Sequence, residues 1–363
     1  MRQGSWLKVG VPASIIALVL ASCGGGPSSV ASSASPSPQA ASPQQQSASP
    51  SVKQTYTVTM AEPAATIAGA PLYVAIQKGF FTAHGIDFKF VSLNTATTVE
   101  QALRSGSVQV ATGGAFNIVE ADAKDAGYQV IETFGSPTLQ LCVSKAYAQV
   151  HNITPQTPLK EMLTQLKGAK LGLNGFGSPV RIPLYYLLKV QLGVEPASWV
   201  TPVSFGSLPA AQTAFKQGSV DMLVNSPPIC QQTSNGEVFL TAAFLPDFEG
   251  TPYQVFYGLE SWAAQNPGAA SGVARAMADG NAYVVKDPAS SAQILHDKYF
   301  PTVGVADIQS LLVTYYAKTI PPDGRMTLEG WQKINKIMVE SGDLSTTPSA
   351  EEGTMWTNKY LGG

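Results

Sequence analysis

One short phrase occurs twice in this chain of 363 residues. Residues Ala102–Val108 (ALRSGSV) return 112 positions later as Ala214–Val220 (AFKQGSV). Each copy is typical of a helix end, a glycine that tolerates the left-handed conformation after the last turn, and a following strand. The repetition predicts two α/β lobes of similar construction, which usually enclose a cleft for small molecules. The alternative is a chance match, since such junctions are common in α/β proteins.

The first residues have the pattern of a secretory signal. Arg2 and Lys8 flank the apolar run Val11–Leu20, which is too short to span a bilayer comfortably. The next residues, Leu20–Cys23 (LASC), resemble the bacterial lipobox, in which cleavage leaves a cysteine that carries diacylglycerol. We therefore expect residues 1–22 to be a lipoprotein signal peptide and Cys23 to be lipidated. An ordinary signal peptide with a chance cysteine is the alternative.

A segment without charge or aromatic rings follows the cysteine. Residues 24–52 are almost entirely Ser, Ala, Pro, Gln and Gly, which cannot bury enough apolar surface to offset the entropy of ordering. We expect residues 23–54 to be a disordered tether. The folded part would then be extracytoplasmic and lipid-anchored to the bacterial cell membrane through Cys23 alone.

The composition of the remaining chain excludes some partners. Removal of the signal leaves 20 basic and 24 acidic residues, a net charge of −4, with no evident basic patch. This balance argues against nucleic acid as a partner. Roughly 310 residues remain after the tether, which is enough for two domains with a large core.

The cysteines and histidines give little indication of a special site. The compartment permits a disulfide between Cys142 and Cys230, but two buried thiols explain the sequence equally well, so the pairing stays open. The histidines His84, His151 and His296 lie far apart without a cluster of cysteines or carboxylates. We therefore expect no metal site and no cofactor.

Strands and helices alternate in the folded part, which predicts mainly parallel sheets. We expect strands at residues 56–60, 86–91, 108–111, 128–134, 169–173, 200–203, 220–224 and 238–244. A loop, Asn225–Pro228, should precede a further helix, and Gly258–Gly342 has an almost wholly helical pattern. The expected domains are lobe 1, at residues 55–137 plus 258–363, and lobe 2, at residues 138–257. The segments Pro137–Ser144 and Pro252–Leu259, which are rich in β-formers, should cross between them.

Several motifs resemble one family in the order in which they occur. They are Ala70–Phe81 (APLYVAIQKGFF) with Gly85–Asp87, then Leu166–Gly172, the second phrase copy ending in Asp221, and Trp356–Leu361. Together they resemble the extracytoplasmic solute-binding proteins of nitrate/sulfonate/taurine-type ABC importers, a group related to the NMT1/THI5-like proteins. The resemblance spans residues 56–361. It implies an α/β, type II periplasmic-binding-protein fold with a cleft that closes on a ligand, and an ABC permease and ATPase as partners of a monomer.

Ligands of open α/β sheets meet the carboxyl ends of the strands, which selects the candidate site. Glycines there allow close approach of the backbone, and helix N-termini can hold a polar or anionic head. The candidate ligand-binding residues are Thr66, Ala70, Thr112, Gly113, Gly114, Ala115, Gly175, Phe176, Gly177, Ser178, Arg181, Asn225, Ser226, Tyr253 and Tyr257. For some of these the role stays open: Ser178 could simply cap a helix, Arg181 could be solvated, and the aromatic residues could serve packing.

The sequence leaves the ligand and the class of function less determined. The stretch Ala64–Gly69 is smaller and less polar than the corresponding wall of thiamine-precursor binders, which disfavours that ligand. The resemblance favours a small organic anion such as a sulfonate, and an uncharged heterocycle remains open. We expect a binding protein and not an enzyme, because the chain has no Gly-x-Ser-x-Gly, His-Glu-x-x-His or phosphate-loop motif. The alternatives are a ligand-sensing lipoprotein and an enzyme on the same fold.

Overall fold

The computed structural model describes residues 54–62, 66–93, 96–135, 137–176, 178–242 and 245–362. The expected signal peptide, Cys23, the tether up to residue 53 and Gly177 lie outside the described residues. The chain divides into the units Met1–Ser51 and Val52–Gly363, and the fold described below belongs to the second unit.

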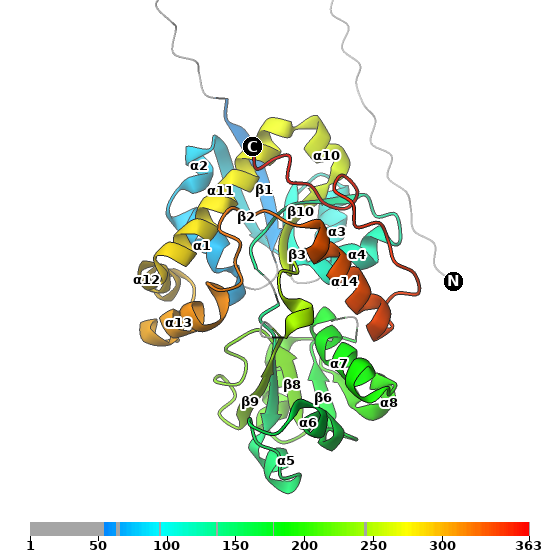
Figure 1. Cartoon of the computed structure of the whole chain (residues 1–363). Coiled ribbons are helices and arrows are strands. Elements are labelled where there is room, and N and C mark those ends of the chain that lie inside the picture. The colour runs from blue at the N-terminus through cyan, green and yellow to red at the C-terminus, as the bar shows by residue number, and fades with distance from the viewer. Residues whose placement is uncertain are drawn as a thin grey trace, which may run out of the picture. The chain divides into compact units, whose positions relative to one another are not determined.

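Two five-stranded sheets with the same strand order form this unit (Figure 1). The first sheet has the order β2 (Ile86–Ser92), β1 (Tyr56–Glu62), β3 (Val110–Gly114), β10 (Gln254–Leu259) and β4 (Tyr128–Thr133). The second sheet has the order β7 (Thr201–Ser204), β6 (Lys170–Leu173), β8 (Met222–Asn225), β5 (Gln140–Ser144) and β9 (Gly236–Thr241). In each sheet the first three strands in this order are parallel to one another. The fourth strand, β10 or β5, runs antiparallel to them. This confirms two α/β lobes of similar construction.

The repeated phrase occupies equivalent places in the two lobes. It ends α3 (Ala96–Arg104) in one lobe and α9 (Leu208–Lys216) in the other. Gly106 and Gly218 both have a φ of 71°, a backbone conformation that strains other residues. The strands that follow, β3 and β8, both take the central place in their sheets. The two copies therefore occupy equivalent structural positions, which argues against a chance match in sequence.

The antiparallel strands correct the expected crossings. β5 pairs with β8 and β9 in the second sheet, and β10 pairs with β3 and β4 in the first. The chain thus crosses between the lobes before each of these strands, once between β4 and β5 and once between β9 and β10. Residues 254–257, which the sequence placed in lobe 2, pair in the first sheet, because their β-formers mark a buried central strand and not a hinge. The other domain boundaries remain a prediction.

Helices cover both faces of each sheet and form the C-terminal return. The first lobe holds η1 (Ile67–Gly69), α1 (Ala70–Gln77), α2 (Phe80–Ala83), α3 and α4 (Ala115–Asp122). The second holds α5 (Lys145–Val150), α6 (Leu159–Gln165), η2 (Pro179–Arg181), α7 (Ile182–Leu192), α8 (Pro196–Trp199), α9 and η4 (Pro246–Phe248). The return holds α10 (Glu260–Gln265), α11 (Pro267–Lys286), α12 (Pro288–Lys298), α13 (Val305–Leu311), η5 (Leu312–Tyr316) and α14 (Leu328–Ser341), which confirms the expected helical pattern.

Three clusters of buried apolar side chains form the core. One lies between the first sheet and helices α1, α11 and α12, and another lies between the second sheet and α9. The third cluster begins on α3 and α4, includes α14, and continues onto α6 and α7 of the second lobe. The two lobes therefore share one apolar core as well as two crossings.

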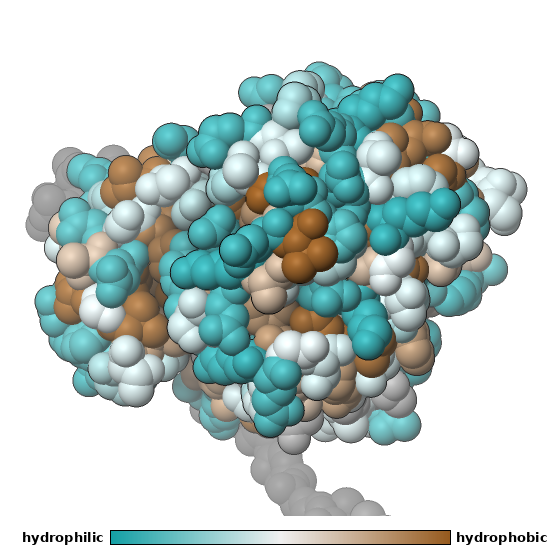
Figure 2. Space-filling view, turned by 90° about the horizontal axis from the view of Figure 1, so that it is seen from below, coloured by the Kyte–Doolittle hydropathy of each residue, from teal (hydrophilic) through white to brown (hydrophobic). Residues whose placement is uncertain are grey.

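The surface is mixed in character. Among the described residues, no helix has the length and hydropathy needed to cross a membrane. Large apolar side chains that stay exposed include Phe90, Val150 and Phe176. Figure 2, a view from below, shows hydrophobic residues interspersed with hydrophilic ones on that face.

Candidate functional site

Loops from the two lobes meet along a line that we call the interlobe seam. It comprises Gly113–Ala115 and Tyr253 from the first lobe, and Pro179 and Asn225–Pro227 from the second. A β-carbon placed on Gly114 would lie 3.8 Å from Cγ of Pro179. The hydroxyl of Tyr316, in the return, donates to the carbonyl oxygen of Pro227 at 3.1 Å. The lobes are thus in contact where the sequence predicted a ligand.

The first-lobe side of the seam is more ordered than a loop. β3 continues to Gly114 instead of ending at Ala111 as expected, because β10 pairs along it with Gln254 opposite Gly114. Ala115 begins α4, and its N–H donates to the carbonyl oxygen of Tyr253 at 2.7 Å. The strand pairing thus brings Thr112–Ala115 and Tyr253 together, as predicted for the site, but uses the first donor of α4 internally.

The loop after β1 supplies residues of contrasting exposure. Thr66 is exposed, and its backbone N–H donates to the hydroxyl of Tyr73 at 3.3 Å. Ala70 is completely buried as the first residue of α1, with Pro71 beside it in the first turn. Of these two predicted contacts, only Thr66 can meet a solute without movement of the helix.

The second-lobe side is built from the ends of β6 and β8. Ser178 precedes η2 in the N-cap position but makes no side-chain capping hydrogen bond. Phe176 in the same loop is 62% exposed. Asn225 ends β8, and its Oδ1 accepts a hydrogen bond of 2.8 Å from the N–H of Ser226. Capping therefore does not account for the hydroxyl of Ser178, whereas the amide of Asn225 is partly used by its own turn.

Arg181 is already paired within the protein. Its Nη1 lies 2.6 Å from Oδ1 of Asp343, and its Nε donates to the carbonyl oxygen of Phe176 at 3.1 Å. The two charged side chains are only 20% and 14% exposed. Asp343 follows α14, so this pair joins the return to the second lobe. A cavity of about 310 Å³ surrounds it, with Phe176, Tyr185 and Glu195 in its wall.

The two candidate tyrosines of the β10 region differ in position. Tyr253 lies at the seam, is buried, and meets Phe116 edge-on with ring centroids 6.0 Å apart. Tyr257 lies four residues further on, within β10, and packs edge-on against Tyr128 with ring centroids 5.2 Å apart. Burial raises the pKa of both Tyr253 and Tyr257, so both hydroxyls stay neutral. The structure therefore brings Tyr253 to the seam, whereas Tyr257 packs within the first sheet with its ring against Gly113.

Two buried amides at the seam were missed by the sequence analysis. Gln140 begins β5 opposite Asn225 of β8, is 0% exposed, and has no hydrogen-bond partner for either atom of its amide. Oδ1 of Asn117, in the first turn of α4, is likewise buried without a partner. It lies 3.3 Å from the position of a β-carbon on Gly114. The sequence signal for Gln140 was a polar residue at the start of a buried strand. The same pattern is typical of an ordinary strand end, so it did not point to a ligand contact.

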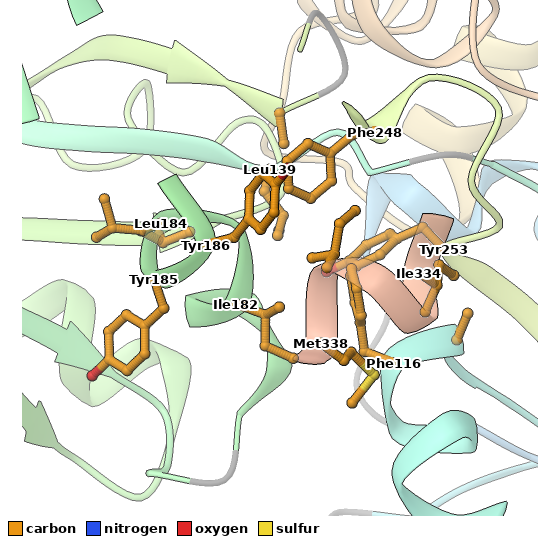
Figure 3. Close-up of a cluster of buried hydrophobic side chains, with 14 of the residues drawn as sticks. Phe116, Leu139, Ile182, Leu184, Tyr185, Tyr186, Phe248, Tyr253, Ile334 and Met338 are labelled. Atoms are coloured by element: carbon orange, nitrogen blue, oxygen red, sulfur yellow. The ribbon is translucent and has the colours of Figure 1, made fainter. Parts of the chain in front are cut away.

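Apolar side chains seal one side of the seam, as Figure 3 shows. Ile182 and Tyr186 of α7 belong to the same buried cluster as Ile334 and Met338 of α14 and Phe116 of α4. Tyr186 also meets Phe248 of η4 at a right angle, with centroids 5.6 Å apart. Separation of the lobes on this side would expose apolar surface.

The open question of the cysteines is answered by the structure. Cys142 and Cys230 form a disulfide, with Cα atoms 5.4 Å apart. Cys142 lies on β5, and Cys230 lies in a run of turns where the sequence analysis wrongly expected a helix. The bond ties the loop after Asn225 to the strand that carries Gln140.

A larger cavity of about 910 Å³ lies beside the crossings and not at the predicted site. Its wall includes Gly135, Thr251 and Pro252 from the crossings and Ile320 and Lys333 from the return. None of the sequence-predicted site residues lines it. Across the described part of the chain, no group of three or more His, Cys, Asp or Glu residues could hold a metal ion.

Comparisons with known proteins agree with this architecture. A family model described as NMT1/THI5 like matches residues 67–291. YtlA of Bacillus subtilis (strain 168), whose name describes it as a binding protein, is 26% identical over 308 residues, which cover 80% of this chain and 86% of that protein.

Solved structures share the fold at low sequence identity. A protein of Bordetella bronchiseptica matches with a TM-score of 0.68 and 21% identity, over 84% of this chain and 95% of that one. The periplasmic aliphatic sulphonate binding protein SsuA of Escherichia coli matches with a TM-score of 0.62 and 17% identity, over 81% of this chain and 90% of that one. At these identities the likeness shows the fold alone, and it confirms the predicted periplasmic-binding-protein architecture.

Proposed function

This chain belongs to the NMT1/THI5-like family, and from that premise we propose that it captures a small solute between its lobes and delivers it to an ABC importer. The observation that carries the proposal is the interlobe seam, where strand-end loops of two like sheets meet. A solute that bridges the lobes would favour their closed arrangement, which a permease with its ATPase would recognise. The sulphonate-binding function of SsuA supports solute capture by analogy of fold.

The setting of this function follows from the N-terminal sequence. We propose that the chain is a monomer outside the cytoplasm, held to the cell membrane by lipid on Cys23. Residues 23–54 would let the folded part turn freely toward a permease. Metabolic labelling with a clickable fatty acid tests the anchor, since Cys23→Ala should abolish the label and release the protein from membranes.

The solute class is the finer part of the proposal. The family resemblance favours a small organic anion such as a sulfonate, with residues at and beside the seam, Thr112–Ala115, Ser178 and Asn225–Ser226, as contacts. The side chains at the seam favour an uncharged solute instead.

A thermal-shift screen against sulfonates, nitrate, bicarbonate, vitamin precursors and aromatic acids tests solute capture. A ligand at 100 times its dissociation constant adds about 2.7 kcal/mol to stability, which should raise the melting temperature by several degrees. A saturable hit that is recovered unchanged supports a binding protein. Conversion of the hit into a product would instead support the alternative of an enzyme on this fold.

A further inference from the structure

The helices that begin near the seam offer few free donors for an anion. Helix N-termini bind anions through unpaired backbone N–H groups. Pro71 stands in the first turn of α1 and Pro179 begins η2, and proline has no N–H. The N–H of Ala115, which begins α4, is donated to Tyr253. Each of these three helix starts has therefore lost a donor.

Positive side chains are also scarce at the seam. The loops Thr66–Ala70, Thr112–Asn117, Asn174–Val180 and Val224–Ile229 contain no Lys, Arg or His. Arg181, which follows the third loop, is neutralised by Asp343 at 2.6 Å. A buried anion without a positive partner or several hydrogen bonds is strongly disfavoured. The charges at the seam thus suit an uncharged ligand better than a sulfonate.

The unpartnered amides of the seam indicate what such a ligand must offer. Gln140 has a free N–H₂ donor and a free carbonyl acceptor, and Asn117 has a free acceptor. Leaving a buried polar group unpaired costs about 1–3 kcal/mol. Gln140 is the cross-strand neighbour of Asn225, so it lies next to one of the predicted contacts. A ligand that supplies partners to these amides would remove that cost.

We propose that the solute is uncharged and carries an adjacent N–H donor and C=O acceptor, as in an amide, ureide or lactam, and that Gln140 selects it. The Gln140 amide forms one hydrogen bond in each direction with this group, and Oδ1 of Asn117 accepts a further N–H. This inference rests on the proposed function, since it names the solute class of the same seam.

Matched pairs of neutral and anionic compounds test the solute class. The purified full chain is titrated by calorimetry with a panel of amides, ureides and lactams, each against an anion with the same ring, for example nicotinamide against nicotinate and benzamide against benzoate and benzenesulfonate. We expect the neutral member of a binding pair to bind at least tenfold more tightly. A response to the anion alone would overturn the inference and leave solute capture standing. Silence toward every pair, together with a hit in the thermal-shift screen, would also overturn the inference alone, whereas silence in both experiments would overturn solute capture and the inference with it.

A variant separates recognition by Gln140 from a structural role. Gln140→Leu removes an unpartnered buried amide, so the free protein should melt at the same temperature or higher, while the neutral compound binds at least tenfold more weakly. Gln129→Leu is the matched control, because Gln129 is a buried glutamine on β4 of the first sheet, away from the seam, and its loss should leave binding unchanged. A lower melting temperature with unchanged affinity in Gln140→Leu would show that Gln140 serves packing alone.

Discussion

Glu132 is a carboxyl group without access to water at the end of β4. Its Oε1 accepts a hydrogen bond of 2.7 Å from Nδ2 of Asn281 in α11, whereas its Oε2 has no partner. The same Asn281 nitrogen lies within hydrogen-bond distance of the carbonyl oxygens of Thr133 and Pro321. Burial raises the pKa of Glu132 well above its usual range, although the bond to Asn281 lowers it. The amide of Asn281 thus joins β4, α11 and the return next to a crossing, and the buried carboxyl group of Glu132 is one of its acceptors.

Glu132→Gln should stabilise the protein at neutral pH. The folded protein keeps the Glu132 proton after the unfolded chain has released its own, so stability contributed by the protonated group is complete below the ordinary glutamate pKa. It is lost as the pH rises toward the raised folded pKa, by up to about 1.4 kcal/mol per pH unit. Urea unfolding from pH 4 to 8 should therefore show a difference between variant and wild type that grows with pH. Exposed Glu161→Gln is the control, and a difference independent of pH would contradict this account.

A polar link joins helices of the two lobes, and a covalent link joins two segments within the second lobe. The Arg181–Asp343 pair joins the start of α7 to the end of α14, and Ser341 Oγ also donates to Asp343 Oδ2 at 2.6 Å. Within the second lobe, the Cys142–Cys230 bond holds the loop after β8 to β5. These links act on the elements that border the seam, and they therefore help to set its geometry.

Loss of the Arg181–Asp343 pair should loosen the contact between α7 and α14. Asp343→Asn leaves a mostly buried guanidinium without its counter-charge, which should cost about 1–2 kcal/mol in urea unfolding, less than a fully buried pair. Glu195→Gln is the matched control, because Glu195 is 66% exposed and lies 3.6 Å from Lys189 in a pair within one lobe. An equal effect of both variants would mean that the Arg181–Asp343 pair has no special role.

Removal of the disulfide should cost more than removal of the ion pair. The bond closes a loop with a sequence separation of 88 residues, which corresponds to about 4–5 kcal/mol on the chain-entropy model. The double variant Cys142→Ala/Cys230→Ala should therefore unfold at a much lower urea concentration. Equal stability of the oxidised wild type and the double variant would show that the bond does not constrain the unfolded chain as proposed.

At the scale of the molecule, the two lobes are coupled by a continuous apolar core. The cluster that includes Phe116, Ile182 and Met338 crosses from one sheet to the other (Figure 3). Separation of the lobes must expose part of this cluster, at about 25 cal/mol for each Å² of apolar surface. Burial of this cluster therefore stabilises the arrangement of the lobes described here, and a solute that bridges them would add to that stabilisation.

A side chain at Gly114 should hold the lobes apart. The φ of Gly114 is −80° with extended ψ, so leucine suits the backbone, but its side chain would extend toward Pro179 across the seam. Gly114→Leu should keep the secondary structure and increase the radius of gyration measured by small-angle scattering. Gly175→Leu is the control, because a β-carbon on Gly175 would meet no atom within 4 Å. An unchanged radius in Gly114→Leu would argue against contact of the lobes in solution.

Local sequence determined the elements and the duplication of this protein. The phrase around Gly106 and Gly218 predicted two like lobes, because a helix end, a left-handed glycine and a strand depend only on neighbouring residues. The neighbourhood of the strand ends near Gly113, Ser178 and Asn225 was also predictable, since parallel strands present their carboxyl ends at one edge.

Tertiary structure alone decided which strand joined which sheet and which polar groups lost their partners. The β-formers of Gln254–Leu259 indicated a strand, but only its pairing with β3 placed it in the first lobe. Arg181 met Asp343, 162 residues away, and Cys142 met Cys230, because folding brought distant segments together. The isolation of Gln140 was invisible in the sequence for the same physical reason: whether a buried amide is satisfied depends on every segment that packs around it.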